Sequence, residues 1–128
     1  MATQAVGVSP SLRSWATATV TTAADGLSDA IDCGGLTLSQ IEMSTAWTDA
    51  PLMFLGSVLS SGNLKQVFTT TGGRLTFQTS ASRSLVFDPY QFAGYRFIQL
   101  ASGDSSTAVA QAAARSVVLG LAPYNPTK

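Results

Sequence analysis

The stretch LMFLGSVLSSGN, residues 52–63, joins the most apolar segment of the chain to a strong turn signal. In residues 52–60, apolar side chains occupy both alternating sets of positions, as in a β-strand that is covered on both faces. Gly62 and Asn63 are residue types that favour a reversal, and the chain then runs back through residues 64–70. The stretch therefore predicts a buried strand that turns into a neighbouring strand.

Similar short runs, separated by turn residues at intervals of roughly ten residues, lie on both sides of this stretch. The further runs are residues 15–21, 36–43, 75–77, 85–87, 95–101 and 116–121, with a short apolar segment at 27–32. Residues 103–114 read as a loop, and no helix of three turns is expected. About eight short strands predict an all-β domain, a single antiparallel β-sandwich or barrel.

One run contains a slip in its alternation. Leu36 and Leu38 share one parity, whereas Ile41 and Met43 have the opposite parity. A β-bulge adds one residue to a strand and so restores a single inward face. We therefore predict a bulge near residues 39–40.

Composition restricts the function further. The chain has 128 residues, enough for one domain, and 45% of them are hydrophobic. Only 11% are charged, against about a quarter in typical proteins. Seven basic residues balance seven acidic ones, and histidine is absent. This argues against a catalytic triad, a histidine-containing metal site, a nucleic-acid-binding face and attachment to an anionic membrane. Surface shape and polar contacts are expected to carry the function.

No motif in the chain points to catalysis or to a bound cofactor. Asp25, Asp29 and Asp32 lie beside turns, where Asp side chains accept hydrogen bonds from backbone groups, and they do not form a calcium loop. No Gly-x-Ser-x-Gly elbow and no phosphate-binding loop is present. Cys33 is the single cysteine, and we interpret it as a small hydrophobic residue. We expect no enzyme activity, no metal and no cofactor.

The two ends of the chain are expected to extend from the domain. Residues 1–14 form a predicted arm, residues 15–121 the domain and residues 122–128 a tail. The first residues lack the basic start and apolar run of a secretory signal, and no apolar run is long enough to cross a bilayer. We therefore expect a soluble protein. The arm and tail either fray or lie across a neighbouring subunit.

Aromatic residues fall into two groups. Six lie at alternating positions of predicted strands and are expected in the core: Trp15, Phe54, Phe68, Phe77, Phe87 and Phe97. Four lie in predicted loops or near an end: Trp47, Tyr90, Phe92 and Tyr124. Exposed aromatic side chains can stack on sugar rings or anchor a protein interface. The alternative, that they close the ends of the domain, stays open for Trp47 and Phe92.

The stretch DPYQFAGYRFIQLASG, residues 88–103, resembles a pattern of small all-β proteins encoded with the structural genes of tailed bacteriophages: Asp-Pro-x-x-Phe-x-Gly-x-Arg-x-hydrophobic-x-Leu-x-Ser-Gly. Residues 27–48 resemble the first half of the same module, and Gln111 with Arg115 resembles its closing strand. The resemblance covers about residues 27–121. It implies a virion accessory protein, a capsid decoration or cement protein with a jelly-roll-like sandwich.

The leading hypothesis is a non-enzymatic bacteriophage structural protein that is made in the host cytoplasm and binds the outer capsid surface of the virion. Its expected partners are the major capsid protein and further copies of itself, as a dimer or trimer, with no nucleic acid and no membrane. The candidate interface residues are Val6, Val8, Arg13, Trp47, Tyr90, Pro123 and Tyr124. The alternative is a head-fibre or tail-fibre module that binds host glycans, which predicts exposed aromatics on one concave surface. A hydrolase, the third alternative, lacks a visible catalytic residue.

Overall fold

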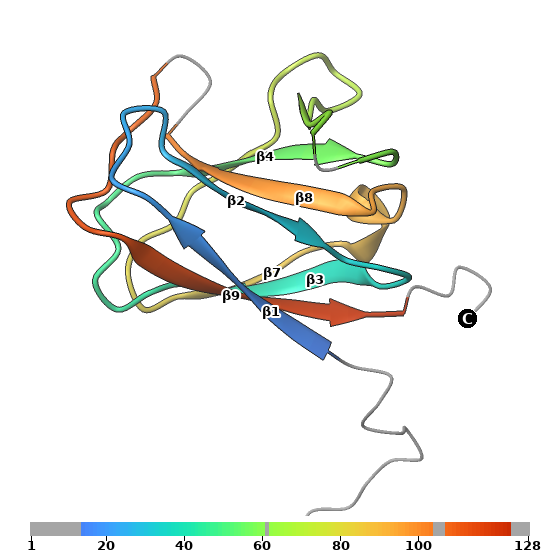
Figure 1. Ribbon diagram of the computed structural model, residues 1–128, viewed down its shortest axis with the longest axis horizontal. Coiled ribbons are helices and arrows are strands. Elements are labelled where there is room, and N and C mark those ends of the chain that lie inside the picture. The colour runs from blue at the N-terminus through green and yellow to red at the C-terminus, as the bar shows by residue number, and fades with distance from the viewer. Residues whose placement is uncertain (1–13, 61, 104–106, 124–128) are drawn as a thin grey trace, which may run out of the picture.

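A computed structural model describes residues 14–60, 62–103 and 107–123, which form β-strands and one short 3₁₀ helix (Figure 1). The strands are β1 (Ser14–Val20), β2 (Leu27–Asp32), β3 (Thr37–Glu42), β4 (Leu52–Ser57), β5 (Lys65–Gln66), β6 (Thr76–Phe77), β7 (Ser84–Val86), β8 (Phe97–Ser102) and β9 (Arg115–Ala122), and the helix η2 spans Pro89–Phe92. The predicted all-β class is confirmed. Every predicted run overlaps a strand, although the bounds differ by one or more residues and several strands are shorter than their runs.

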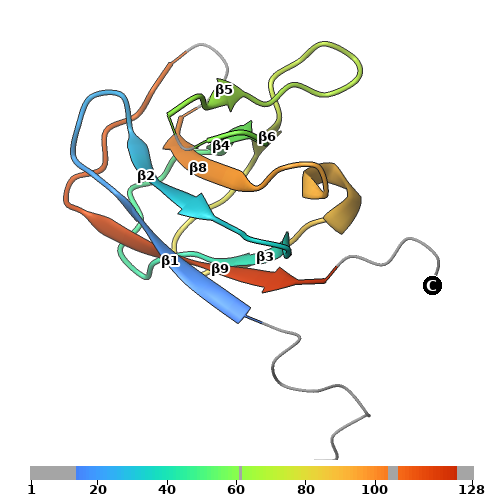
Figure 2. The same cartoon turned by 45° about the vertical axis from the view of Figure 1, so that its right-hand side comes forward.

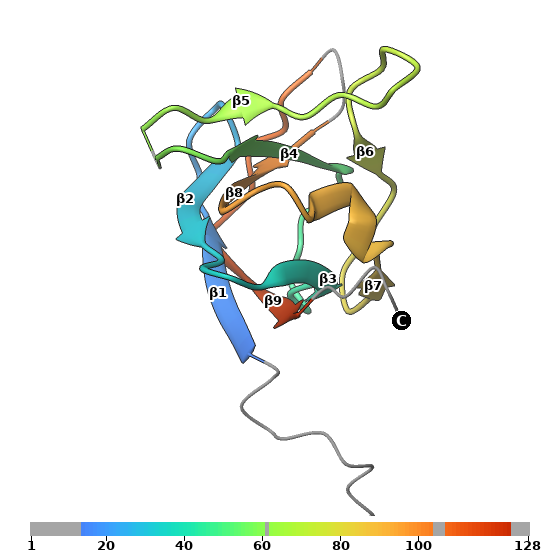
Figure 3. The same cartoon turned by 90° about the vertical axis from the view of Figure 1, so that its right-hand side faces the viewer.

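The strands pair antiparallel along one path of hydrogen bonds. Their order is β5-β4-β8-β2-β1-β9-β3-β7, and β6 pairs with β4 beside this path. The sheet curls, so that β4 and β8 face β3 and β9 across the interior (Figures 2 and 3). The structure is therefore a curled antiparallel sheet. The jelly-roll-like sandwich stays a prediction, because the described strands are joined in one path rather than in two separate sheets.

The predicted bulge in β3 is confirmed. Against β9, Leu38 pairs with Leu121 but Gln40 pairs with Gly120, so Ser39 is the extra residue. The bulge turns the side chains on both sides of it toward the interior, and Leu38 and Ile41 are both fully buried. An insertion of one residue therefore explains the slipped alternation of the sequence.

Four phenylalanine rings pack together in the interior. Phe54 from β4 contacts the rings of Phe77, Phe87 and Phe92 edge to face, with centroids 5.0 to 5.7 Å apart. The helix η2 places Phe92 there, and Asp88 caps this helix by accepting a hydrogen bond from the Tyr90 N–H at 3.0 Å. Edge-to-face pairs add about 0.5–1.5 kcal/mol each to the free energy gained by burial. The packed rings fix the distance between the two halves of the curled sheet, with β4 and β8 in one half and β3 and β9 in the other (Figure 3).

A buried glutamine ties two loops to the sheet. The side chain of Gln111 accepts a hydrogen bond from the Thr48 N–H at 2.7 Å and donates to the Thr48 carbonyl at 3.1 Å. It also donates to the Ser102 hydroxyl at 2.8 Å. Both polar atoms of the Gln111 side chain therefore have hydrogen-bond partners, which compensate for the hydration lost on burial. The loop before β9 is thereby fixed against the loop after β3.

Candidate interaction site

Large hydrophobic side chains are exposed at several places on the described surface. Their exposed fractions run from 55% for Phe68 to 83% for Val86. The full set is Trp15, Val58, Leu59, Phe68, Val86 and Tyr90. Single exposed hydrophobic residues are common, but two of these line one hollow and two line another, and such groups often mark interaction sites.

The first hollow has a volume of about 330 Å³ and carries two exposed aromatic side chains, Phe68 and Tyr90. It is lined by Val67, Phe68, Thr69, Thr70, Leu75, Tyr90 and Gln91. Val67 and Leu75 are buried and form its floor, joined by a hydrogen bond from the Leu75 N–H to the Val67 carbonyl at 2.9 Å. We call these seven residues the aromatic hollow.

Two local structures hold the aromatic side chains over the hollow. Phe68 pairs with Arg74 across a tight reversal, in which the Thr69 N–H donates to the Gly73 carbonyl at 2.7 Å. Gly72 in this reversal has a φ of +97°, a conformation that favours glycine. Tyr90 lies in η2, whose first turn is fixed by Asp88. Both side chains therefore project from short segments that the backbone holds in place.

The chemistry of the aromatic hollow is that of binding. Its lining holds aliphatic, aromatic, hydroxyl and amide side chains and no carboxylate or ammonium group. Such a surface can stack on a sugar ring or receive an apolar side chain of a protein.

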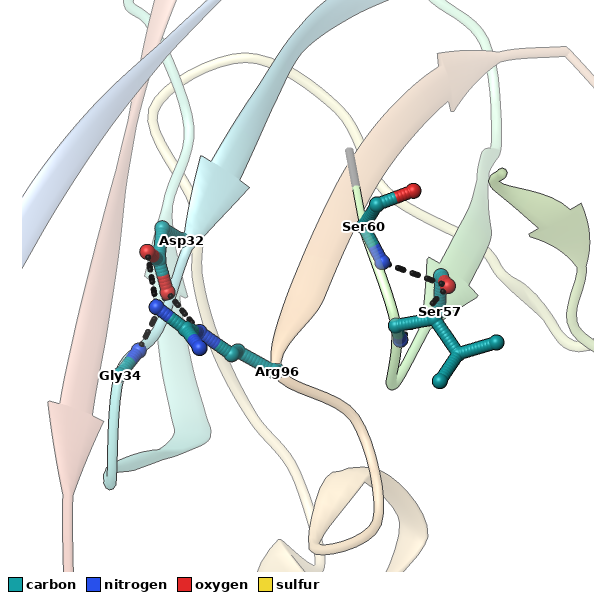
Figure 4. Close-up of polar contacts among 6 residues, drawn as sticks. Asp32, Gly34, Ser57, Ser60 and Arg96 are labelled. Atoms are coloured by element: carbon teal, nitrogen blue, oxygen red, sulfur yellow. Dashed lines mark hydrogen bonds and ion pairs between the residues drawn. The ribbon is translucent and has the colours of Figure 1, made fainter. Parts of the chain in front are cut away.

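The second hollow, of about 360 Å³, lies beside Tyr95 and includes the exposed Val58 and Leu59. The ring of Tyr95 lies against Gly56 of β4, where a Cβ atom would come within 2.6 Å of the ring. The Ser57 hydroxyl accepts hydrogen bonds from the Leu59 N–H at 3.1 Å and the Ser60 N–H at 3.4 Å (Figure 4). These bonds hold the apolar pair in a fixed turn after β4.

An exposed ion pair stands near this second hollow. Arg96 donates to both carboxylate oxygens of Asp32, at 3.0 and 3.1 Å, and the Gly34 N–H donates to the same carboxylate at 2.9 Å (Figure 4). The hydrogen bond from Arg96, followed by that from Gly34, lowers the pKa of Asp32. The same pair raises the pKa of Arg96. Both groups therefore stay charged at neutral pH and serve as fixed polar contacts.

The structure assigns different places to the predicted interface residues. Tyr90 is exposed and lines the aromatic hollow, and Pro123 is exposed after β9. Val6, Val8, Arg13 and Tyr124 lie outside the described residues. At the two ends, Ser14 belongs to β1 and Ala122 to β9, so the strands extend one residue beyond the predicted domain.

The prediction that Trp47 is an exposed interface residue is corrected, because the side chain is buried. It is only 5% exposed, and its indole N–H donates to the Ala50 carbonyl at 3.0 Å. Phe92 is likewise buried. For both residues, the alternative that they close the domain is the one the structure supports. A tryptophan in a turn-rich segment can be buried because its N–H finds a backbone partner there.

Two aromatic residues expected in the core are exposed instead. Trp15 is 70% exposed on the outer face of β1, and Phe68 is 55% exposed at the aromatic hollow. Alternation placed Trp15 in a strand correctly but could not tell which face of that strand is covered, and Phe68 lies outside the named strands, in an isolated bridge with Arg74. The alternation of residues 64–70 did not show that β5 ends at Gln66, which leaves Phe68 beyond the strand.

Reactive groups do not gather in the described part of the chain. No group of three or more His, Cys, Asp or Glu side chains there could hold a metal ion. Cys33 is buried, and this burial, with the nearby charge of Asp32, raises the pKa of its thiol to about 11. At neutral pH the thiol of Cys33 is therefore protonated and unreactive.

No described helix is long and apolar enough to cross a membrane.

Comparison with known protein families, curated proteins and solved structures found no match to this chain. Its function must therefore be inferred from its residues and their arrangement.

Proposed function

We propose that this chain is a non-enzymatic bacteriophage virion protein that binds the outer capsid surface as a homo-oligomer and stabilises contacts between major capsid subunits. The observation that carries the proposal is the spread of exposed apolar side chains over several separate parts of the described surface, from β1 to β7 and both hollows. A protein that bridges neighbours needs more than one contact surface. Aromatic and apolar side chains supply most of the binding free energy in such contacts.

The low charge of the chain supports the same role. Only 11% of its residues are charged, and their signs balance. Many copies packed side by side on a particle then repel one another little, since the net charge of each copy is close to zero. Contacts between them depend on shape, backbone hydrogen bonds and apolar burial.

The arm and the tail are the further contact candidates of this proposal. Residues 1–13 contain Val6, Val8 and Arg13, and the tail contains Pro123 and Tyr124. Fully extended, the arm of residues 1–13 spans at most roughly 45 Å, enough to reach over a neighbouring subunit. Binding by such segments needs no preformed pocket.

The first test is the copy number in purified virions of the phage that carries the encoding gene. Quantitative mass spectrometry against the major capsid protein is expected to give several hundred copies per particle. A handful of copies would contradict capsid decoration and indicate a tail component.

The second test removes residues 1–13. The truncated chain is expected to keep the circular dichroism spectrum of the intact protein and to lose binding to capsids that lack the native protein. Full occupancy of the particles by the truncated chain would contradict a role for the arm.

A glycan-binding fibre module remains the second candidate, because Phe68 and Tyr90 meet on one concave surface. A glycan array with the intact protein tests it, with a Phe68→Ala/Tyr90→Ala double variant as the specific probe. Trp15→Ala is the matched control, since it removes an exposed aromatic far along the chain from the hollow. Reproducible signals that only the double variant loses would favour glycan binding over capsid decoration.

A further inference from the structure

The chain enters and leaves the described domain at the same end. β1 begins at Ser14, opposite the last residues of β9, and Ala122 of β9 pairs with Thr37 at the start of β3. Residues 1–13 precede this point, and residues 124–128 follow it. Figure 1 shows β1 starting and β9 ending on the same side of the domain. The arm and the tail, the contact candidates of the proposed function, therefore both start from one end of the domain.

Arg96 joins the turns at this end. Its N–H donates to the Ser57 carbonyl at 3.2 Å, and its carbonyl accepts a hydrogen bond from the Cys33 N–H at 2.7 Å. Ser57 is the last residue of β4, and Cys33 begins the turn between β2 and β3. The turns after β2 and β4 therefore lie beside the start of β1 and the end of β9. We call these parts together the arm end: Ser14, Ala122 and residues 33–36, 57–60 and 93–96.

Two hollows at the arm end share the side chains of Val58 and Tyr95. One is the second hollow described above, and the other, of about 210 Å³, is lined by residues 34–37, Val58 and residues 93–96. Val58 is 60% exposed and Leu59 is 77% exposed. The Ser57 hydroxyl, which accepts hydrogen bonds from two N–H groups of this turn, holds both residues in place (Figure 4). Val58 and Leu59 therefore form a fixed apolar ridge beside the two hollows.

The opposite end of the domain has a different surface. It is formed by the loops of residues 21–26, 43–51, 78–83 and 107–114. No large hydrophobic side chain of these described loops is exposed, whereas Trp15, Val58 and Leu59 are exposed at or beside the arm end. Charged residues are exposed at the opposite end instead, namely Asp25, Asp49 and Arg83. Exposed apolar groups mark interaction surfaces, so the arm end is the end suited to contact.

Charge describes the partner that fits this end. Of the described residues that line the second hollow, only Lys65 is charged. It is exposed and forms no ion pair within the described chain. Asp32, the acidic residue of the nearby ion pair, is already bonded to Arg96 through both carboxylate oxygens. A carboxylate of the partner would therefore pair with Lys65, beside a groove that accepts the apolar ridge.

We propose that the arm end faces the capsid, and that the Val58–Leu59 ridge enters an apolar groove of a major capsid subunit that carries a carboxylate opposite Lys65. The inference rests on the proposed function, which supplies the capsid as the partner. The arm and the tail then start next to the surface that they cross. The exposed charges of the opposite end stay in water, and a ridge flanked by hollows gives the complementary shape that a protein interface requires.

Three serine variants test the ridge by their binding to capsids that lack the native protein. Val58→Ser and Leu59→Ser are expected to keep the circular dichroism spectrum, because both side chains are exposed, and to raise the dissociation constant roughly tenfold or more. Val86→Ser is the matched control, since Val86 is 83% exposed on β7, away from the arm end, and it should bind as the native chain does. If both ridge variants bind as tightly as the native chain, the inference is wrong.

A charge reversal tests the carboxylate of the groove. Lys65→Glu should raise the dissociation constant roughly tenfold, with a larger effect at low ionic strength, because it places two negative charges opposite each other. Arg83→Glu makes the same change at the opposite end and should have no effect. Lys65→Glu binding as tightly as the native chain would contradict the carboxylate.

Thiol labelling on the particle tests which end faces the shell. Gly35→Cys places a thiol at the arm end, where a Cβ atom meets nothing within 4 Å, and Thr22→Cys places one in an exposed loop of the opposite end. The native Cys33 is buried and contributes little labelling. A maleimide should react with the thiol at position 35 at least roughly tenfold more slowly on capsids than in solution, and with that at position 22 at an unchanged rate. Protection of position 22 alone would overturn the inference.

The outcomes separate this inference from the proposed function. An intact chain that does not bind capsids contradicts the proposed function, and the inference fails with it. Native binding that the ridge variants retain contradicts the inference alone. Sedimentation equilibrium of the intact chain without capsids covers the other occupant. Self-association that Val58→Ser abolishes would place a second copy on the ridge and would also overturn the inference.

Discussion

Phe54 and Phe68 lie on neighbouring segments of the same half of the sheet, yet one is fully buried and the other is 55% exposed. Both follow an apolar alternation that predicted a core position. Phe54 lies between the two halves of the curled sheet, where three other rings surround it. Phe68 lies beyond the short β5, where no second layer covers it. The same residue type therefore stabilises the fold in one place and is available for binding in the other.

The largest expected effect separates these two phenylalanines directly. Phe54→Ala should lower the free energy of unfolding by about 3–5 kcal/mol, because it leaves a cavity among packed rings. Phe68→Ala should change it by about 0.5 kcal/mol or less. Urea unfolding followed by circular dichroism measures both. Equal losses for the two variants would contradict the assignment of Phe68 to a binding surface.

A smaller effect distinguishes a buried glutamine from an exposed one. Gln111→Ala leaves the backbone groups of Thr48 without their partner and should cost about 1–3 kcal/mol. Gln91→Ala, at the rim of the aromatic hollow, should leave stability unchanged. Hydrogen exchange of the Thr48 amide is the second measurement, and it should accelerate only in the Gln111 variant. An unchanged exchange rate there would mean that another group holds the loop.

Two glycines test the packing of the second hollow in the same way. Gly56→Ala brings a Cβ atom within 2.6 Å of the Tyr95 ring, so the ring must move at a cost of about 1–3 kcal/mol. Gly35→Ala meets nothing within 4 Å and should be neutral. A double-mutant cycle with Tyr95→Ala should show coupling with the Gly56 change. Additive costs would show that Tyr95 is not the neighbour that matters.

The smallest expected effect concerns the buried thiol of Cys33, whose ionisation does not affect the free energy of unfolding at neutral pH. Burial raises its pKa from about 9.0 to about 11, so the native chain should react slowly with a thiol reagent at pH 8 and rapidly in denaturant. As pH rises, the thiol of the unfolded chain deprotonates first. The stabilisation is therefore complete below about pH 9 and is lost between pH 9 and 11.

A Cys33→Ala variant is the control for this pH dependence. Its free energy of unfolding should lack the part of the alkaline loss that the native chain owes to the thiol. Rapid labelling of the native chain at pH 8 would contradict the buried position of Cys33.

Local sequence features predicted much of the architecture. The turn residues located the strands, and the slipped parity around Ser39 predicted the bulge. The expected role of the turn aspartates is confirmed as well, since Asp25 accepts a hydrogen bond from the Leu27 N–H and Asp32 accepts one from the Gly34 N–H. These features depend on contacts over a few residues, so a short stretch of sequence is enough to specify them.

The burial of the aromatic side chains could not be predicted from such local features. Trp47 and Phe92 are buried, whereas Trp15 and Phe68 are exposed, although their sequence contexts predicted otherwise or left the question open. Each of these outcomes depends on which distant segment covers a face or an edge, and such pairings join residues far apart in the chain.

The sequence by itself determined an all-β chain with little charge, short strands and turns closed by aspartate and glycine. Only the tertiary structure decided that the sheet curls around four phenylalanine rings and that Phe68 and Tyr90 share a hollow. The physical reason is range. Backbone preferences and turn chemistry act between near neighbours, whereas covering a face requires segments that come together only when the whole chain folds.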